Sequence, residues 1–457
     1  MLISPFRLKK SWPLLALSVC VFLGLYIGYG IVYANDSYTY LVGSVRVSPL
    51  YPLLIALLRA VFPEALYLHA LVLLQELLAA YAVFSLLSYI GKRFSLHPAA
   101  LTILLLAFIG SYFLRLFMVD EAALYCNAIL TEGLTYPLYF LFVKYAFMAW
   151  DSRNLRYLFT AFLLAFLLAG VRGQLICLFL VVAILFLAIV KKSEAPLPVR
   201  RRVWFCAGAL GIVYFVALAL ISAAYNYAIS GAASQTTMGK ETVFGAVLYN
   251  CDAEDAALFA AGSPEQAILT ETLSAGEAEA LTYKGAPSDF IGRFKHYEAS
   301  HDELRDILRA AVIKVDRRGY QTDDEQRLAM TSHIDRMLPA LLWNNLGRYL
   351  RNCTVNCFGG LVRSNSIMRA MGVVLSAFVY AFCLVFLLLS GKRPSLDGEK
   401  RFLLLVLMCT LINAMFCSFG VFELSRYVYY NFPCIYLALA LYMSALLPVR
   451  VERRMRT

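Results

Sequence analysis

The sequence predicts an all-α integral membrane protein with about ten transmembrane helices, interfacial helices on its outer face and a small helical extracytoplasmic domain. Of the 457 residues, 61% are hydrophobic and only 16% are charged, whereas a soluble chain of this length needs more charge to wet its surface. Several apolar runs reach the roughly 20 residues that cross a hydrocarbon core of about 30 Å. One long segment in the second half has no such run and is acidic, which indicates a soluble insertion.

Basic residues set the predicted orientation of the spans. They form six short clusters that an alternating arrangement of ten spans places on one side, and such clusters favour the cytoplasm. Both termini are therefore expected in the cytoplasm. The clusters are Arg7 to Lys10, Lys92/Arg93, Arg153/Arg156, Lys191/Lys192 with Arg200 to Arg202, Lys392/Arg393 with Lys400/Arg401, and Arg450 to Arg456. The predicted spans are 12–34, 67–90, 99–118, 130–149, 157–170, 174–190, 203–225, 370–390, 402–420 and 428–447.

The net charge of +11 does not indicate a nucleic-acid-binding protein. Between Lys240 and Arg336 there are 18 acidic and 11 basic residues, a net charge of −7, which leaves +18 on the rest of the chain. That surplus lies in short loops between apolar runs, as the positive-inside rule expects. No basic stripe interleaved with aromatic residues lies in a soluble segment, so no nucleic-acid partner is expected.

Three units follow from this layout. Residues 1–225 form an N-terminal transmembrane module of about seven spans, with a long first outer loop at 35–66. Residues 226–345 form the extracytoplasmic helical domain, where Ser263, Ser274 and Thr322 each begin a helix-capping pattern. Residues 346–457 form an interfacial segment and a C-terminal module of about three spans. Leucine-rich stripes at helical spacing, at 50–62 and 338–350, predict amphipathic helices in the membrane interface.

Two acidic residues on the predicted outer face are candidates for catalysis. Asp36 follows the first span, close to Tyr40 and Tyr51, and a carboxylate there can accept a proton from an incoming hydroxyl. The alternative is that Asp36 caps the next helix. Glu132 opens the fourth span, where the alternative is that the helix dipole simply favours an acid in the first turn.

Two arginines on the same face are candidates for binding a phosphate. Arg172 lies in the turn between spans five and six, and Arg426 precedes Tyr427 where the last span begins. Arginine on this side runs against the positive-inside bias and needs a partner, and guanidinium matches phosphate in a bidentate manner. The alternatives are an ion pair of Arg426 with Glu423 and contact of Arg172 with lipid headgroups. Cysteine and histidine spacing shows no metal motif, so no cofactor is expected to be required, although Asp36 leaves room for a divalent cation.

These features together resemble the GT-C superfamily of membrane glycosyltransferases, in the branch of protein O-mannosyltransferases and bacterial aminoarabinose transferases. The resemblance lies in the acid after the first span, the segment Ser48-Pro-Leu-Tyr-Pro-Leu-Leu54, Thr131-Glu132 and Arg426-Tyr427. The family's first-loop pattern is Asp-Glu-x-x-Tyr, which Asp36 and Tyr40 match, while Ser37 replaces the glutamate. The resemblance implies that Asp36 is the base and that Glu132 occupies the family's later acidic position.

The function expected from this resemblance is an inverting transferase on the outer face of a bacterial inner membrane. It would move a sugar from a polyprenyl-phosphate donor to a glycan, lipid or protein acceptor, with Tyr40, Tyr51, Arg172, Arg426 and Tyr427 in the substrate site. One alternative is an O-antigen ligase or polymerase using pyrophosphate-linked glycan and the outer-loop residues His296, His301 and His333. Another is a transporter or flippase for lipid-linked sugar, which the absence of an internal sequence repeat disfavours.

Overall fold

The computed structural model describes residues 12–118, 125–191, 197–317, 319–390, 393–420 and 425–446. Every regular element in these ranges is a helix, and the only β pairing in them is an isolated bridge between Val32 and Ala128. The all-α prediction is therefore confirmed for the described part of the chain.

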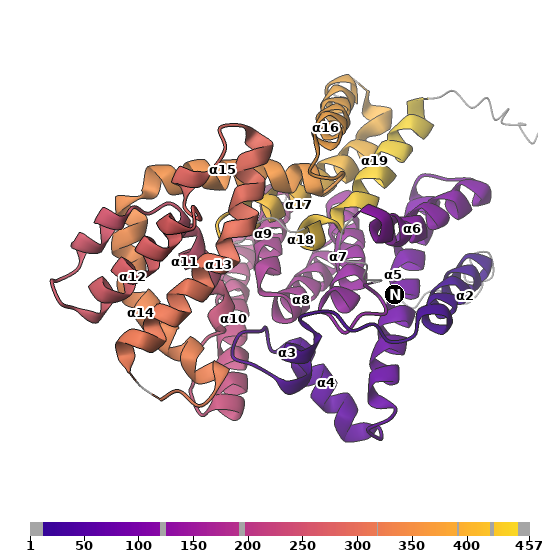
Figure 1. The fold of residues 1–457 in the computed structure, drawn as a ribbon. Coiled ribbons are helices and arrows are strands. Elements are labelled where there is room, and N and C mark those ends of the chain that lie inside the picture. The colour runs from indigo at the N-terminus through magenta and orange to yellow at the C-terminus, as the bar shows by residue number, and fades with distance from the viewer. Residues whose placement is uncertain are drawn as a thin grey trace, which may run out of the picture.

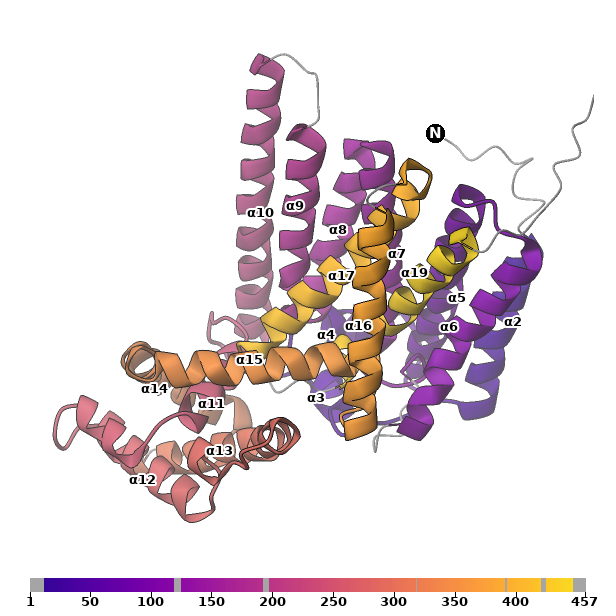
Figure 2. The same ribbon diagram turned by 90° about the horizontal axis from the view of Figure 1, so that it is seen from above.

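The first half of the chain forms a bundle of long helices, whose close association is visible in two views (Figures 1 and 2). Its core contains side chains from α2, α5, α6, α7, α8 and α9, and α7 is the most completely buried of these helices. The elements of this half are α2 (Trp12–Tyr29), α3 (Ser37–Val42), α4 (Leu50–Val61), α5 (Tyr67–Arg93), α6 (Pro98–Met118), α7 (Glu132–Ser152), α8 (Leu155–Val171), η1 (Gly173–Cys177), α9 (Leu178–Lys191) and α10 (Leu197–Ser230).

The last helices of the chain return to the same bundle. Side chains of α17 and α19 enter the core formed by the first half. This arrangement brings residues 413–420 and 425–430 next to η1, so residues that are far apart in sequence meet at one end of the bundle. The elements are α16 (Ala370–Ser390), η4 (Pro394–Leu396), α17 (Asp397–Ser418), α18 (Ser425–Val428) and α19 (Asn431–Leu446).

Six helical segments within the described ranges are long and apolar enough to cross a membrane: Trp12–Tyr29, Tyr67–Arg93, Gly173–Lys191, Arg201–Ser230, Ala370–Ser390 and Pro394–Ser418. A membrane protein is thus indicated by composition and length. Each of the other four predicted spans also coincides with a helix, namely α6, α7, α8 and α19. The apolar stretches of α6, α8 and α19 are shorter, while α7 has 21 residues with a glutamate, a lysine and three tyrosines. Packing inside the bundle accounts for this more polar sequence.

Three of the six basic clusters come together where α5 and α7 end and α17 begins. Arg93 bonds to Asp151 at 2.6 Å, and Arg401 lies 3.9 Å from the same carboxylate. Residues of the α5–α6 turn, the end of α7 and the α16–α17 turn line one surface pocket there. The opposite ends of these helices, at Tyr67, Glu132 and Ser418, therefore share the other face of the bundle.

A second hydrophobic core belongs to the helices that follow α10, and it is separate from the core of the bundle. Its elements are α11 (Thr237–Tyr249), η2 (Ala253–Leu258), α12 (Pro264–Ala278), η3 (Tyr283–Gly285), α13 (Phe290–Asp316) and α14 (Asp323–Asn344). Ser263 caps α12 and Thr322 forms a complete capping box with Glu325, as predicted. The third predicted start is wrong, because Ser274 lies inside α12; its serine–glutamate spacing occurs there by chance.

The two leucine-rich stripes predicted to form amphipathic helices, at 50–62 and 338–350, differ in outcome. In α4, Tyr51 and Ile55 are buried while Leu53, Leu57 and Val61 face outward. The predicted stripe at 338–350 does not form one helix: α14 ends at Asn344 and α15 (Leu346–Arg363) begins after a break at Asn345. The cause is the buried Asn345 side chain, which bonds to Asp255 and to the Leu341 carbonyl. Figure 2 shows α15 running across the direction of α16 and α17.

Candidate functional site

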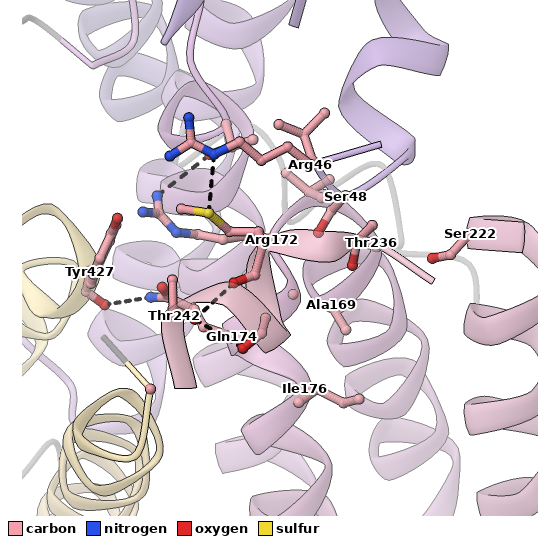
Figure 3. A pocket seen from close by; sticks show the side chains of 18 of the residues that line it. Arg46, Ser48, Ala169, Arg172, Gln174, Ile176, Ser222, Thr236, Thr242 and Tyr427 are labelled. Atoms are coloured by element: carbon pink, nitrogen blue, oxygen red, sulfur yellow. Dashed lines mark hydrogen bonds between the residues drawn. The ribbon is translucent and has the colours of Figure 1, made fainter. Parts of the chain in front are cut away.

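A cavity of about 620 Å³ lies between the helical domain and the face of the bundle that carries Glu132. The bundle contributes residues of α3, α7, α10, α17 and α18 and of the α8–η1 turn, and the domain contributes α11 and α13. Figure 3 shows Arg46, Arg172 and Gln174 around this cavity, with Ser222 supplied by α10. Six of the seven predicted site residues line it, namely Asp36, Tyr40, Glu132, Arg172, Arg426 and Tyr427, whereas Tyr51 does not.

Glu132 and Arg172 form a buried ion pair at the inner wall of the cavity. Arg172 Nη1 lies 2.6 Å from Glu132 Oε1, and the two side chains are 11% and 2% exposed. Glu132 is the first residue of α7, as predicted, and Arg172 follows the last residue of α8. Thr131 donates its hydroxyl to Glu132 Oε2 at 3.1 Å. The carboxylate therefore holds the α8–η1 turn against the start of α7.

Asp36 and Arg426 form a second pair that is more open to solvent. Arg426 Nη2 donates to Asp36 Oδ2 at 2.9 Å, and the Asp36 side chain is 34% exposed. Asp36 precedes α3 but makes no side-chain capping bond, so the capping alternative is not supported. The predicted first span is also too long, because α2 ends at Tyr29 and Asp36 lies in the following loop. The alternative partner of Arg426, Glu423, lies outside the described residues.

Both pairs meet through one arginine and one aromatic ring. Arg426 Nε lies 3.8 Å from Glu132 Oε1, which links the two acids. The Tyr427 ring lies 4.4 Å from the Arg172 guanidinium carbon and 5.4 Å from that of Arg426. The Tyr427 carbonyl accepts hydrogen bonds from Gln174 and Asn413 (Figure 3 shows the first). This position of Tyr427 fixes the ring against both guanidinium groups.

Of the two predicted tyrosines, only Tyr40 faces the cavity. Burial, and then the Glu132 carboxylate, raise the pKa of Tyr40 above its usual range, so its hydroxyl stays protonated. Tyr51 is fully buried and its hydroxyl donates to Gln75, while its ring packs edge-on against Tyr40. The prediction that Tyr51 lines the site is therefore wrong: it supports Tyr40 from behind, because the apolar face of α4 turns it inward.

The opposite wall contains charged residues that the sequence analysis did not select. Arg46 comes from the loop before α4, and Asp302 and Arg305 come from α13. Arg46 Nε contacts Met238 Sδ at 3.2 Å, and Arg305 Nη2 pairs with Asp302 at 2.7 Å. Arg46 was detectable, because it is an arginine on the predicted outer face, like Arg172. Arg305 was not, since it lies in a helix where acidic and basic residues alternate.

The outer-loop histidines do not form a common site. His301 borders the cavity, but its side chain is fully buried and lies 3.0 Å from the Thr242 carbonyl. His296 bonds to Tyr249 and to the Ala280 carbonyl, and His333 lies between Glu265 and Asp316. Among the described residues, no group of three or more histidine, cysteine or acidic side chains could hold a metal ion.

Comparison with known proteins found no matching family model, no matching curated protein and no matching solved structure. The chemistry of the cavity is therefore argued from its own residues. It combines an accessible carboxylate, two arginines and a protonated tyrosine hydroxyl beside helices that are apolar enough to cross a membrane. Such a set can accept a proton, stabilise a departing anion and donate a hydrogen bond.

Proposed function

We propose that the chain is an inverting glycosyltransferase that takes a sugar from a polyprenyl-phosphate donor at the outer face of a membrane. The observation that carries the proposal is the Asp36–Arg426 pair, which puts an accessible carboxylate and a phosphate-binding cation in one cavity. The cavity also reaches apolar side chains of α10 and α17, beside which a polyprenyl chain can lie. The full proposal has ten spans, cytoplasmic termini and a bacterial inner membrane.

The proposed reaction is a single displacement. Asp36 takes the proton of an acceptor hydroxyl, whose oxygen attacks the anomeric carbon from the face opposite the phosphate. The bond between that carbon and the phosphate oxygen breaks, its electron pair leaves with polyprenyl phosphate, and the configuration inverts. Because a glycosyl phosphate already has a good leaving group, no second carboxyl acid is required, in contrast to glycosidases.

Asp36 Oδ1 is the atom proposed to act as the base. Oδ2 accepts from Arg426, whereas Oδ1 accepts no hydrogen bond from any residue in the described part of the chain. A guanidinium carries five N–H donors, so Arg426 can orient Asp36 and contact a phosphate at once. Arg172 is proposed to bind the phosphate from the side of Tyr427, and Glu132 to position Arg172. A divalent cation is not part of this scheme, and a chelator tests its role.

Two observations favour transfer over the alternatives. The ligase or polymerase hypothesis relies on outer-loop histidines, but His296 and His333 do not line the cavity. His301 borders it, but its side chain is fully buried against the Thr242 carbonyl. The second observation is that Asp36 Oδ1 accepts no bond from a described residue, so it can take the proton of an acceptor hydroxyl, a step that transport alone does not need. The acceptor is proposed to be a glycan, lipid or protein that bears a hydroxyl group.

The test is an assay for a glycosylated product in proteoliposomes that contain the full-length protein and a polyprenyl-phosphate sugar. Transfer should give a product with inverted anomeric configuration and should persist in the presence of a chelator. Movement of labelled donor across the bilayer without any product would support the flippase and contradict the proposal. Activity with polyprenyl-pyrophosphate glycan alone would support the ligase or polymerase instead.

A further inference from the structure

The positive charge in the cavity is distributed unevenly between its two walls. On the inner wall, Arg172 and Arg426 face Glu132 and Asp36, so each arginine has its own carboxylate. On the outer wall, the charged lining residues are Arg46, Arg305 and a single acid, Asp302, which pairs with Arg305. An excess positive charge therefore lies on the outer wall, next to the helical domain.

Neither arginine of the outer wall has a full set of partners. Arg46 makes no ion pair with a described residue, and its Nε atom donates only to Met238 Sδ at 3.2 Å. Arg305 is 8% exposed, and its buried Nε atom has no hydrogen-bond partner. Its Nη1 atom contacts the same sulfur at 3.9 Å. A thioether is a weak acceptor, so these donors are poorly satisfied.

The nearby acids are already engaged elsewhere. Asp323 pairs with Arg309 and Arg327, and Asp324 accepts from Ser44 and from the Val45 amide. Two guanidinium groups on one sulfur atom also repel each other, and at partial burial this repulsion is only weakly screened. An anion between Arg46 and Arg305 would remove the repulsion and satisfy the buried donor.

We infer that Arg46 and Arg305 form a second anion subsite, which binds a phosphate group in the outer half of the cavity. Arginine matches the tetrahedral oxyanion of a phosphate in a bidentate manner, which makes phosphate a better fit than a point-charge ligand such as chloride. The subsite joins the loop before α4 to α13, so its ligand would also link the bundle to the helical domain. Its assignment to a transferase substrate rests on the proposed function, whereas the anion site itself does not.

The experiment measures protection of Arg46 from phenylglyoxal, an arginine-specific reagent, in the full-length protein in detergent micelles. Peptide mass spectrometry gives the labelling rate in inorganic phosphate and in sodium chloride of equal ionic strength. Phosphate should slow the labelling of Arg46. It should not change the labelling rate of Arg309, which lies one turn after Arg305 on α13 and outside the cavity. Equal rates in both salts would overturn the inference, as would an Arg46 that does not react in chloride, because its guanidinium would then already be occupied.

A variant tests whether the two arginines bind the phosphate together. In Arg305→Gln, the phosphate concentration that half-protects Arg46 should rise about tenfold, as expected for one lost charge-assisted hydrogen bond. Arg309→Gln is the matched control and should leave this concentration unchanged. If Arg305→Gln elutes as a monodisperse protein and protects Arg46 as well as the wild type does, the shared subsite is disproved.

A second arm identifies the source of the phosphate. Polyprenyl monophosphate is added to the same micelles in place of inorganic phosphate. If polyprenyl monophosphate protects Arg46, the subsite binds the phosphate of the donor lipid. If it protects Arg426 alone, the subsite binds a phosphate of the acceptor. Both results support the subsite when inorganic phosphate protects Arg46. If inorganic phosphate protects Arg46 but no glycosylated product forms, the subsite stands and the proposed function is disproved.

Discussion

The two acid–arginine pairs of the cavity have the same chemistry but different surroundings. Glu132 and Arg172 are almost completely buried between α7 and the α8–η1 turn. Asp36 and Arg426 lie at the ends of short segments, and a third of the Asp36 side chain is exposed. Breaking a buried pair leaves an uncompensated charge in a poorly solvated position, whereas an exposed pair separates at low cost.

This difference assigns different roles to two acids that look alike in sequence. Glu132 has little access to substrate, so its carboxylate positions Arg172 and holds the inner wall together. Asp36 has one oxygen available to a ligand, so it is the acid that we propose as the base. The comparison leads to predictions in which one acid affects turnover and the other affects stability.

The largest expected effect is on turnover in Asp36→Asn. Asparagine keeps the size of the side chain and removes the base, so turnover should fall by about 10²–10⁴-fold while the protein stays folded. Turnover is measured in proteoliposomes at saturating acceptor, and Asn35→Ser, at the exposed neighbour outside the cavity, is the matched control. If turnover stays within about threefold of wild type, the loss is far smaller than the contribution of a general base. The base would then be a residue other than Asp36.

The next effect is on stability in Glu132→Gln. Removing the charge leaves Arg172 buried without its partner, which should destabilise the protein by about 3–5 kcal/mol. The loss is measured as unfolding in detergent micelles, and adding Arg172→Met should recover part of it, because the double variant buries no unpaired charge. A Glu132→Gln protein as stable as wild type but inactive would reverse the roles of the two acids. We also expect Arg172→Ala to be destabilised, because Glu132 would then be buried without its partner.

Features that depend on local composition could be predicted from the sequence. Each of the ten predicted spans coincides with a helix, and the capping residues Ser263 and Thr322 begin helices as expected. Boundaries that depend on tertiary contacts could not be predicted. The break at Asn345 arises because its side chain is buried against Asp255, a residue 90 positions earlier in the chain. Nothing in the leucine spacing around it signals that break.

The site shows the same division. The arginines on the predicted outer face stood out because they contradict a simple charge rule, and Arg172 and Arg426 do lie together. Their partners could not be inferred, since the pair between Asp36 and Arg426 joins residues 390 positions apart. Arg305 was missed for a related reason: only its position on the lining of the cavity, which depends on the tertiary structure, distinguishes it from other arginines of the same helix.

A smaller effect is expected on donor binding in Arg426→Gln. Loss of one charge-assisted contact to the donor phosphate should weaken donor binding by about 1.5–3 kcal/mol. Because Asp36 is partly exposed, its own loss of a partner should leave the protein folded. Donor affinity is measured with a labelled polyprenyl-phosphate sugar in micelles, and Arg363→Gln, at a residue that does not line the cavity, serves for comparison. Unchanged donor affinity would show that the phosphate binds elsewhere.

The smallest effect is expected in Tyr427→Leu, which removes the ring shared by both pairs. A cation–π contact contributes about 0.5–1 kcal/mol at exposed sites and about 2 kcal/mol when desolvated. Its loss should weaken donor binding by an amount within that range. The Tyr427 carbonyl can still accept from Gln174 and Asn413, so the backbone should keep its position. Arg172 is nearer to the ring than Arg426 is, so the change should perturb the buried pair more. A double-mutant cycle with Arg426→Gln measures the coupling between Tyr427 and Arg426 in donor affinity. Additive effects would show that the ring contributes through Arg172. Strong coupling would show that the ring acts through Arg426 and that the two pairs work as one unit.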